Sequence, residues 1–331
     1  DFLPELDLLT YLEAVLRVYN RYGRRDNKFK ARIKILVKAL TPEGFAEKVE
    51  AEWQHIKESP TRLTPEAIQR IQAYFTEPDY AAIDNATDLL ASQRFEDRGF
   101  DQWLTHNVDT HKKAGYAIVS LTMKKTGTPP GDVSDKQLEQ IADLADEFSF
   151  GEIRVTHQQN VVLADVRQDR LFELWQAITP MGFGTANLNT LTDVICCPGG
   201  DYCALANAKS IPVAEAIQRQ FDDLDYLYDL GNIDLNISGC MNACGHHHVG
   251  NIGVLGVDKK GQEFYQISLG GSSHHDASIG KILGPSFARD EMPKVISKII
   301  DVYVDKRTEE ETFLDTYRRV GIDPFKERVY A

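Results

Sequence analysis

The sequence predicts an α+β fold, in which helices and strands are grouped in separate parts of the chain. Three observations support this prediction. The N-terminal part carries apolar side chains at helical spacing, a strand–helix–strand–strand–helix pattern follows Gly115, and the C-terminal part combines glycine-rich segments with further helices. The length of 331 residues corresponds to two domains at roughly 150 residues each.

Composition excludes several classes of protein. A hydrophobic fraction of 42% and a charged fraction of 26% are those of an ordinary globular chain. No apolar run approaches the roughly 18 residues that a membrane span requires, and a net charge of −13 argues against a general nucleic-acid binder. The chain starts at Asp1 with no secretory leader, so we expect a cytoplasmic protein and a piece of a longer polypeptide.

The N-terminal part is expected to be helical. One amphipathic helix is predicted over residues 5–20, and a second over residues 42–56. Residues 65–94 are expected to form a connector that is helical at first and then irregular. The predicted apolar face of the first helix consists of Leu8, Leu9, Leu12, Val15, Leu16 and Tyr19.

The middle part is predicted to form a sheet with two helices. A capping box at Ser134 and Gln137 marks the start of the first helix. This order of elements is typical of part of a ferredoxin-like fold, with Phe172 and Trp175 expected in its core. The expected elements are a strand at 116–122, a helix from 134, strands at 152–156 and 160–164, and a helix at 169–178.

The third part begins near Gly182 and contains helices at about 211–221 and 292–304, a glycine-rich stretch at 245–271 and a charged helical tail. We therefore expect three segments. Residues 1–90 end in the connector, residues 91–181 form the ferredoxin-like half-domain, and residues 182–331 form an α/β domain that contains all five cysteines.

The cysteines form two spaced pairs. Cys197 and Cys203 are separated by five residues, and Cys240 and Cys244 by three. Four reduced thiolates from two loops can enclose a tetrahedral zinc ion or a cubane iron–sulfur cluster. A five-residue gap is wide for zinc, and the flanking glycines let backbone N–H groups approach sulfur, so the pattern favours the cluster. The alternative is that some of these are buried core cysteines; Cys196 is interpreted as structural.

The motifs together resemble a known family. The two cysteine pairs, the Ser238–Gly245 segment (SGCMNACG), the glycines at 253 and 256 and the Leu269–Gly271 segment are similar to the siroheme and [4Fe–4S] module of assimilatory sulfite and nitrite reductases. The block 151–164 (GEIRVTHQQNVVLA) is similar to the ferredoxin-like half-domain of that family. The resemblance thus extends over most of the chain.

This resemblance implies cofactors and an activity. It implies that Cys197, Cys203, Cys240 and Cys244 hold the cubane, and that Cys244 is also the axial ligand that bridges to the siroheme iron. The activity implied is the six-electron reduction of sulfite to sulfide, as in sulfur assimilation. Nitrite reduction to ammonia is the close alternative, because the ligand motif is shared.

A basic stretch from Arg17 to Lys38 carries nine Lys or Arg residues and a single acid, Asp26. Within it, Lys28 and Lys30 resemble the family's alternating lysines on the distal side of the haem, which implies that they bind the anion and deliver protons. The alternatives are a solvated helix face and, less favoured, a nucleic-acid patch. Candidate partners for haem carboxylates in this stretch are Arg24, Arg25 and Arg32.

Further cofactor-binding candidates are Arg154, Asn160 and Asn242. Arg154 and Asn160 match strand-end positions used by the family, although Arg154 could equally be a surface residue, and Asn242 lies between two cluster ligands. The adjacent histidines at 246–248 could hold a second metal, but polar packing is the favoured interpretation. Tyr202 and Met241 are expected to shield the cluster as core residues.

The chain departs from the family in extent. Family members are duplicated, whereas this chain corresponds to the end of a first repeat, the second half-domain and the second repeat. The family's substrate-binding arginines precede the part that this chain matches. Without them the distal pocket is incomplete, which again leads us to expect a longer parent.

The electron donor is expected to be another protein, because no dinucleotide or flavin motif stands out. A reductase flavoprotein and a ferredoxin both fit. Two alternatives of other classes remain open: a non-catalytic iron–sulfur electron carrier and a zinc-stapled interaction module.

Overall fold

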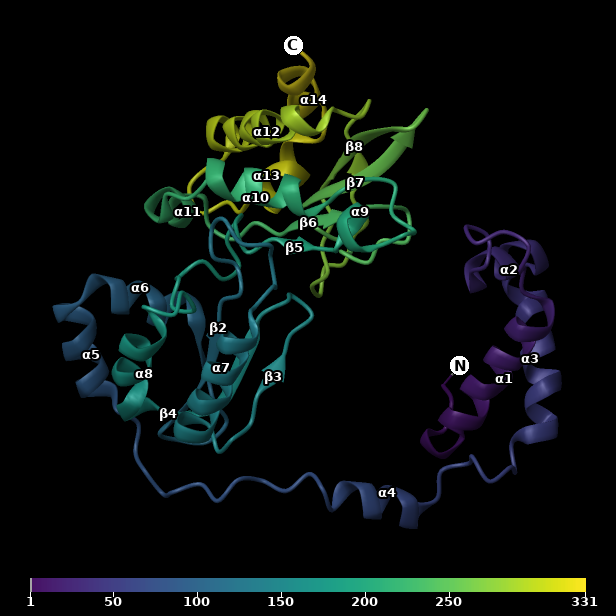
Figure 1. Cartoon of the computed structure of the whole chain (residues 1–331), viewed down its shortest axis with the longest axis horizontal. Coiled ribbons are helices and arrows are strands. Elements are labelled where there is room, and N and C mark those ends of the chain that lie inside the picture. Colours follow the sequence, from purple (N-terminus) through teal and green to yellow (C-terminus); the bar gives the residue numbers. More distant parts are fainter. Residues whose placement is uncertain (1) are drawn as a thin grey trace. The chain divides into compact units, whose positions relative to one another are not determined.

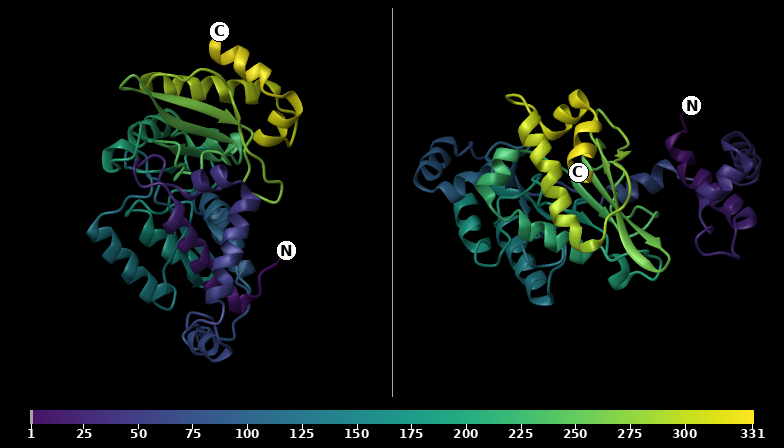
Figure 2. Two further views of the ribbon diagram at one scale, coloured as in Figure 1. Left: turned by 90° about the vertical axis from the view of Figure 1, so that its right-hand side faces the viewer. Right: turned by 90° about the horizontal axis from the view of Figure 1, so that it is seen from above.

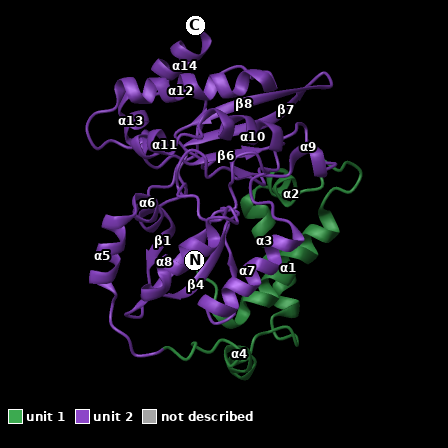
Figure 3. Ribbon diagram, turned by 60° about the vertical axis from the view of Figure 1, so that its left-hand side comes forward, with its two compact units in different colours: residues 1–80 green, residues 81–331 purple. Residues whose placement is uncertain are grey.

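The computed structural model describes residues 2–331, which form two compact units that divide after Tyr80 (Figure 3). None of the described helices is long and apolar enough to span a membrane. The mixture of helices and two separate sheets is α+β, as the sequence predicts.

Unit 1 is helical and has a small core of its own. Helices α1 and α3 bury Ala14, Val18, Val49 and Ile56 between them, and the indole N–H of Trp53 donates to the Thr10 hydroxyl at 3.0 Å. The predicted helix at 42–56 is confirmed. The elements are η1 (Glu5–Asp7), α1 (Leu8–Tyr22), α2 (Ile33–Leu40), α3 (Pro42–Ile56) and α4 (Pro65–Gln72).

Most of the predicted apolar face of α1 is not buried, although Val15 of that face packs against the core. Thr10, Ala14 and Val18 face the core, whereas Leu16 is 63% exposed. Small side chains at Thr10 and Ala14 allow α3 to approach closely, so the core forms on that side. The other leucines of the predicted face, Leu8, Leu9 and Leu12, are also exposed.

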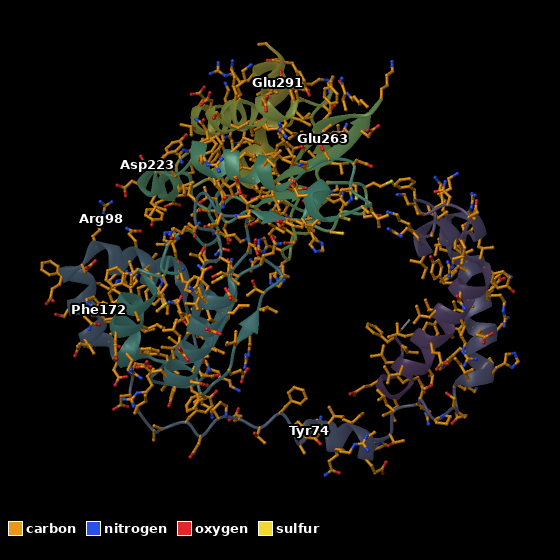
Figure 4. All side chains as sticks on the ribbon, in the orientation of Figure 1. Tyr74, Arg98, Phe172, Asp223, Glu263 and Glu291 are labelled. Atoms are coloured by element: carbon orange, nitrogen blue, oxygen red, sulfur yellow. The ribbon has the colours of Figure 1, made fainter. Side chains whose placement is uncertain are left out.

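The first part of unit 2 is the antiparallel sheet with order β1-β2-β4-β3 (Figure 1). The predicted order of strands and helices is confirmed, and Ser134 and Gln137 form the predicted capping box. Phe172, labelled in Figure 4, packs edge-on against Phe100 with ring centroids 5.0 Å apart. The elements are α5 (Thr87–Glu96), α6 (Arg98–Asn107), β1 (Val108–Thr110), β2 (Tyr116–Leu121), α7 (Asp135–Phe148), β3 (Arg154–Val155), β4 (Val161–Arg167), η2 (Gln168–Arg170) and α8 (Leu171–Ile178).

The second part of unit 2 is a five-stranded sheet with order β5-β6-β7-β8-β9. Its first three strands are parallel and the remaining pairings are antiparallel. The glycine-rich stretch proves to contain the long β7–β8 hairpin. The strands are β5 (Ile195–Cys196), β6 (Leu235–Ser238), β7 (Ile252–Lys259), β8 (Gln262–Leu269) and β9 (Lys281–Ile282).

Helices cover this sheet, and the expected helices at 211–221 and 292–304 are confirmed within two residues at their ends. Helix α12 runs along the sheet (Figure 2), and its side chains share one core with those of β6, β7 and β8. The helices are α9 (Gly199–Tyr202), α10 (Ile211–Gln220), α11 (Leu224–Leu230), η3 (Arg289–Glu291), α12 (Met292–Lys306), α13 (Phe313–Val320) and α14 (Asp323–Tyr330).

The apolar residues of α1 lie at the same helical positions as those of α12, which packs on a sheet. Both have 15 residues, and Leu12 and Leu16 occupy the same positions in α1 as Ile296 and Ile300 in α12. The two isoleucines are fully buried in the core of the sheet, while the two leucines are exposed. Helix α1 therefore carries the pattern of a sheet-packing helix, although the described residues of unit 1 form no strand.

Truncation of the core side chain Val49, in Val49→Ala, should destabilise unit 1 by about 2 kcal/mol through lost burial and a small cavity. The matched change Leu16→Ala removes a larger but exposed side chain and should cost far less. Hydrogen exchange of the α3 amides measures both. Equal effects would show that Leu16 is buried as deeply as Val49.

Candidate metal centre

Two adjacent parallel strands bring the cysteine pairs to one edge of the sheet. Cys197 follows β5 and Cys240 lies two residues after β6, and the carboxyl ends of parallel neighbours lie side by side. The Cys197 N–H continues the pairing by donating to the Ile237 carbonyl at 3.1 Å. Cys197 and Cys240 are buried, Cys203 is half-buried and Cys244 is exposed; all are free thiols.

The strand pairing and the bond from the Gly239 N–H to the Cys197 sulfur bring the two cysteine loops together. Burial and the neighbouring thiols of Cys197, Cys240 and Cys203 all raise the pKa of Cys244. Across residues 2–331, however, no three His, Cys, Asp or Glu side chains are grouped closely enough to hold a single metal ion.

Glycines allow the two cysteine loops to touch. A Cβ atom at Gly239 would lie 2.9 Å from the Gly199 Cα and 2.7 Å from the Ala208 carbonyl oxygen. Gly199 itself has a φ of 58°, which favours glycine. This close approach lets the Gly239 N–H donate to the Cys197 Sγ at 3.1 Å, a contact that would stabilise a thiolate there.

The loop that carries Cys240 and Cys244 is held tightly against β6. Its turn closes with the Ala243 N–H donating to the Cys240 carbonyl at 3.1 Å. The Gly245 N–H donates to the Ser238 hydroxyl at 3.1 Å, and a Cβ at Gly245 would lie 2.0 Å from the Ile237 carbonyl oxygen. The glycine after the last cysteine is therefore required by the close approach of backbone to backbone.

A further serine supports the site from the other loop. The hydroxyl of Ser210, the residue just before α10, lies 3.4 Å from the Cys197 Sγ. Ser238 belongs to the cysteine motif but had no role assigned to it there, and Ser210 is not part of any motif in the sequence. The role of Ser238 could have been found from that motif, whereas no sequence signal identifies Ser210.

The half-domain holds the segment that precedes Cys197. The Gln159 side chain accepts from the Cys196 N–H and donates to the Cys196 carbonyl, both at 2.8 Å. The buried Cys196 thiol donates to the Cys197 carbonyl at 3.3 Å, and burial raises its pKa. These contacts agree with the interpretation of Cys196 as structural.

The candidates Asn160, Arg154 and Asn242 lie in different environments. Asn160 is buried, donates to Asp193 at 2.9 Å and accepts from the Met123 N–H at 3.0 Å, so its amide is used within the protein. Arg154 is exposed and pairs with Glu152 at 2.5 Å. Asn242 is half-buried between the second pair of cysteines. Their roles toward a cofactor stay predictions.

Two residues expected in the core are at the surface. Tyr202 is 79% exposed and Met241 is 53% exposed, so neither is a core residue here. Tyr202 lies in α9 and Met241 lies in the turn after Cys240. Both segments are short connections between two cysteines, and both side chains point outward. Of the three adjacent histidines, only His247 is buried, and burial lowers its pKa to about 4.

The basic residues lie in unit 1, in the loop between α1 and α2 and on the flanking helices. Glu13, one turn earlier on α1, and Glu52 of α3 both pair with Arg17, and Glu52 also lies 3.7 Å from Arg21. These acids partly neutralise the start of the stretch. The positive excess is therefore concentrated at residues 24–38.

Lys28 and Lys30 are exposed in this loop, and among the described residues neither has a carboxylate within 4.0 Å. Arg24 pairs with Asp26, and Arg25 stacks over the Tyr19 ring at 4.6 Å. Arg32 is half-buried and donates to the Ala31 carbonyl at 3.0 Å. These five candidates share one loop, while the four cysteines and Asn242 share another site in unit 2.

Comparison with known proteins connects this site to a family. The nitrite and sulphite reductase 4Fe-4S domain matches residues 1–57 and 188–331, and the nitrite/sulfite reductase ferredoxin-like half domain matches residues 121–181. The chain therefore belongs to the nitrite and sulfite reductase family, whose cofactors are siroheme and a [4Fe–4S] cluster.

Individual relatives include both kinds of reductase. The chain is 26% identical over 325 residues to "Sulfite reductase [ferredoxin] 2" of Mycolicibacterium paratuberculosis, covering 95% of this chain and 51% of the relative. It is 24% identical over 310 residues to a chloroplastic ferredoxin–nitrite reductase of Arabidopsis thaliana, covering 90% and 46%. The chain thus spans about half the length of these relatives.

A solved structure shares the fold. The NirA protein of Mycobacterium tuberculosis matches with a TM-score of 0.65 and 24% identity, over 98% of this chain and 54% of that structure. This similarity confirms the predicted α+β architecture.

Replacement of Gly239 by alanine tests the contact between the loops. The added Cβ must push Gly199 or Ala208 away, so Gly239→Ala should lose most of the bound iron of a protein purified without air. The control Gly44→Ala adds a Cβ in unit 1 with no atom closer than 3.6 Å and should retain it. The iron content of the purified variants is the measurement. Full iron content in Gly239→Ala would contradict the close packing of Gly239 against Gly199 and Ala208.

Proposed function

We propose that this chain is the cluster- and siroheme-carrying portion of a reductase that converts sulfite to sulfide. The observation that carries the proposal is the placement of four free thiols, from two loops, at the carboxyl ends of adjacent parallel strands. The donor set is entirely thiolate and the backbone already donates an N–H to one sulfur, which suits a cubane cluster.

We assign the cluster to Cys197, Cys203, Cys240 and Cys244. Cys244 is exposed, so its sulfur is accessible to a second group, as the role of bridging ligand to siroheme requires. When bound, the coupled cofactors would supply the electrons and the open iron position for multi-electron reduction. The protein's part is to ligate, orient and charge-balance them.

We assign anion binding and proton delivery to Lys28 and Lys30. A doubly charged oxyanion needs concentrated positive charge, and each oxygen that leaves as water needs protons. Lys28 and Lys30 lack an ion pair among the described residues and lie where the positive excess is greatest. Arg24, Arg25 and Arg32 in the same loop suit the carboxylates of siroheme.

Substrate and donor are proposals drawn from the relatives. Both sulfite and nitrite reductases are among them, and their names specify ferredoxin as donor. We favour sulfite because the overall pattern resembles bacterial sulfite reductases; nitrite is the second candidate, since the motif is common to both. A ferredoxin is the proposed donor, and the reducing cytoplasm is the proposed compartment for five free cysteines.

The ligand assignment predicts a sharp contrast among the five cysteines. Each of the four single Cys→Ser changes at 197, 203, 240 and 244 should abolish or strongly reduce cluster content, because serine is a poor ligand for this iron site. Cys196→Ser should retain it, because that thiol only donates to a backbone carbonyl. Iron and acid-labile sulfide measure the outcome. Loss at Cys196 but not at Cys203 would refute the assignment.

The lysine assignment predicts a loss of activity without the loss of cluster that is expected of the cysteine variants. Lys28→Ala and Lys30→Ala should each lower sulfite reduction by about 100-fold, the range of lost proton transfer or anion stabilisation. Lys34→Ala, an exposed lysine on α2, is the matched control and should stay near wild type. Activity is followed by oxidation of a reduced viologen dye with sulfite and with nitrite. Unchanged rates in both variants would remove these lysines from the mechanism.

A further inference from the structure

A fully buried lysine lies beside the segment that leads into the first cluster ligand. Lys124 follows β2 by three residues, and its side chain has no exposed surface. Its ammonium donates to the carbonyls of Gln158 and Val194, both at 2.7 Å, and lies 3.6 Å from the Asp193 carboxylate. Val194 and Asp193 belong to the segment that continues through β5 to Cys197.

The partners of this lysine are themselves buried and bonded. Asp193 accepts from the Asn160 side chain at 2.9 Å and from the Asn189 N–H at 3.1 Å. Three oxygen atoms surround the ammonium and replace the water that it loses on burial. An isolated buried charge would lack this compensation. Burial still lowers the pKa of Lys124, whereas the Asp193 carboxylate raises it.

This network does more than join the half-domain to the second sheet. Lys124 donates a hydrogen bond to the backbone at Val194, just before β5. Gln159 forms hydrogen bonds with the backbone two residues later, at Cys196. Cys197 is the next residue in the chain. The ammonium is held at the Val194 carbonyl, three residues before Cys197, and its side chain has no exposed surface, so water does not screen its charge there.

We propose that Lys124 is a positioning residue for the metal centre: it fixes the segment that presents Cys197 and, paired with Asp193, sets the electrostatic potential at the cluster. This inference rests on the proposed function. A positive charge in a low-dielectric interior stabilises the reduced, more negative state of a cluster, and a carboxylate destabilises it.

The direction in which the cluster's reduction potential shifts distinguishes an electrostatic role of Lys124 from a purely structural one. Lys124→Met removes the positive charge and should make the cluster's reduction potential more negative. Asp193→Asn keeps an oxygen that can accept from Asn160, removes the negative charge and should make the potential more positive. A merely structural role would move both variants in the same direction or not at all.

The measurement is a redox titration of the cluster by electron paramagnetic resonance, in the full chain purified without air. We expect each variant to change the reduced-to-oxidised ratio at the wild-type midpoint by about tenfold, ~59 mV for one electron. Lys125→Met, at the adjacent exposed lysine, is the control and should leave the midpoint in place.

The outcomes distinguish this inference from the function on which it rests. Wild-type protein without iron and sulfide contradicts the proposed function itself. A wild-type cluster whose potential is the same in Asp193→Asn, or shifts with the same sign in both variants, overturns the role of Lys124 alone. If Lys124→Met does not accumulate, the shift in Asp193→Asn decides, because that variant keeps the shape of the side chain and one of its two acceptor oxygens, losing only the bond from the Asn189 N–H.

Discussion

The parallel pairing of β5 with β6 is the constraint on which the rest of the site depends. These strands are short, yet their register places the residues after Cys196 opposite those after Ile237. Two loops that are about forty residues apart in the sequence thereby meet at one edge. The Gly199–Gly239 contact and the hydrogen bond from the Gly239 N–H to the Cys197 sulfur both depend on this close approach of the two loops.

The segment that leads through β5 to Cys197 is supported from both sides. On one side β6 pairs with it, and on the other Gln159 and Lys124 of the half-domain bond its backbone. A site that must hold a large anionic cluster benefits from ligands on rigid elements rather than on free loops, because the geometry is then set before the cofactor binds. The ferredoxin-like part thus supports the segment that carries Cys197.

Much of this could be read from the sequence, and the failures have physical causes. The cysteine spacing and flanking glycines indicated the centre because cluster ligands impose local patterns. The capping box at Ser134 and the helix at 42–56 were predictable because their signals are local. The buried face of α1 was not, since burial depends on the partner that a helix meets and its leucines fit a sheet-packing helix. Lys124 gave no signal, because nothing local distinguishes a buried lysine from its exposed neighbour Lys125.

The most direct test of the account is the absorption spectrum of the protein purified without air, with iron and acid-labile sulfide measured on the same sample. The account predicts a siroheme spectrum together with about four sulfides per chain, the content of one cubane. A colourless protein that contains zinc and no labile sulfide would contradict it and would leave a scaffold in which the two cysteine pairs hold a structural ion.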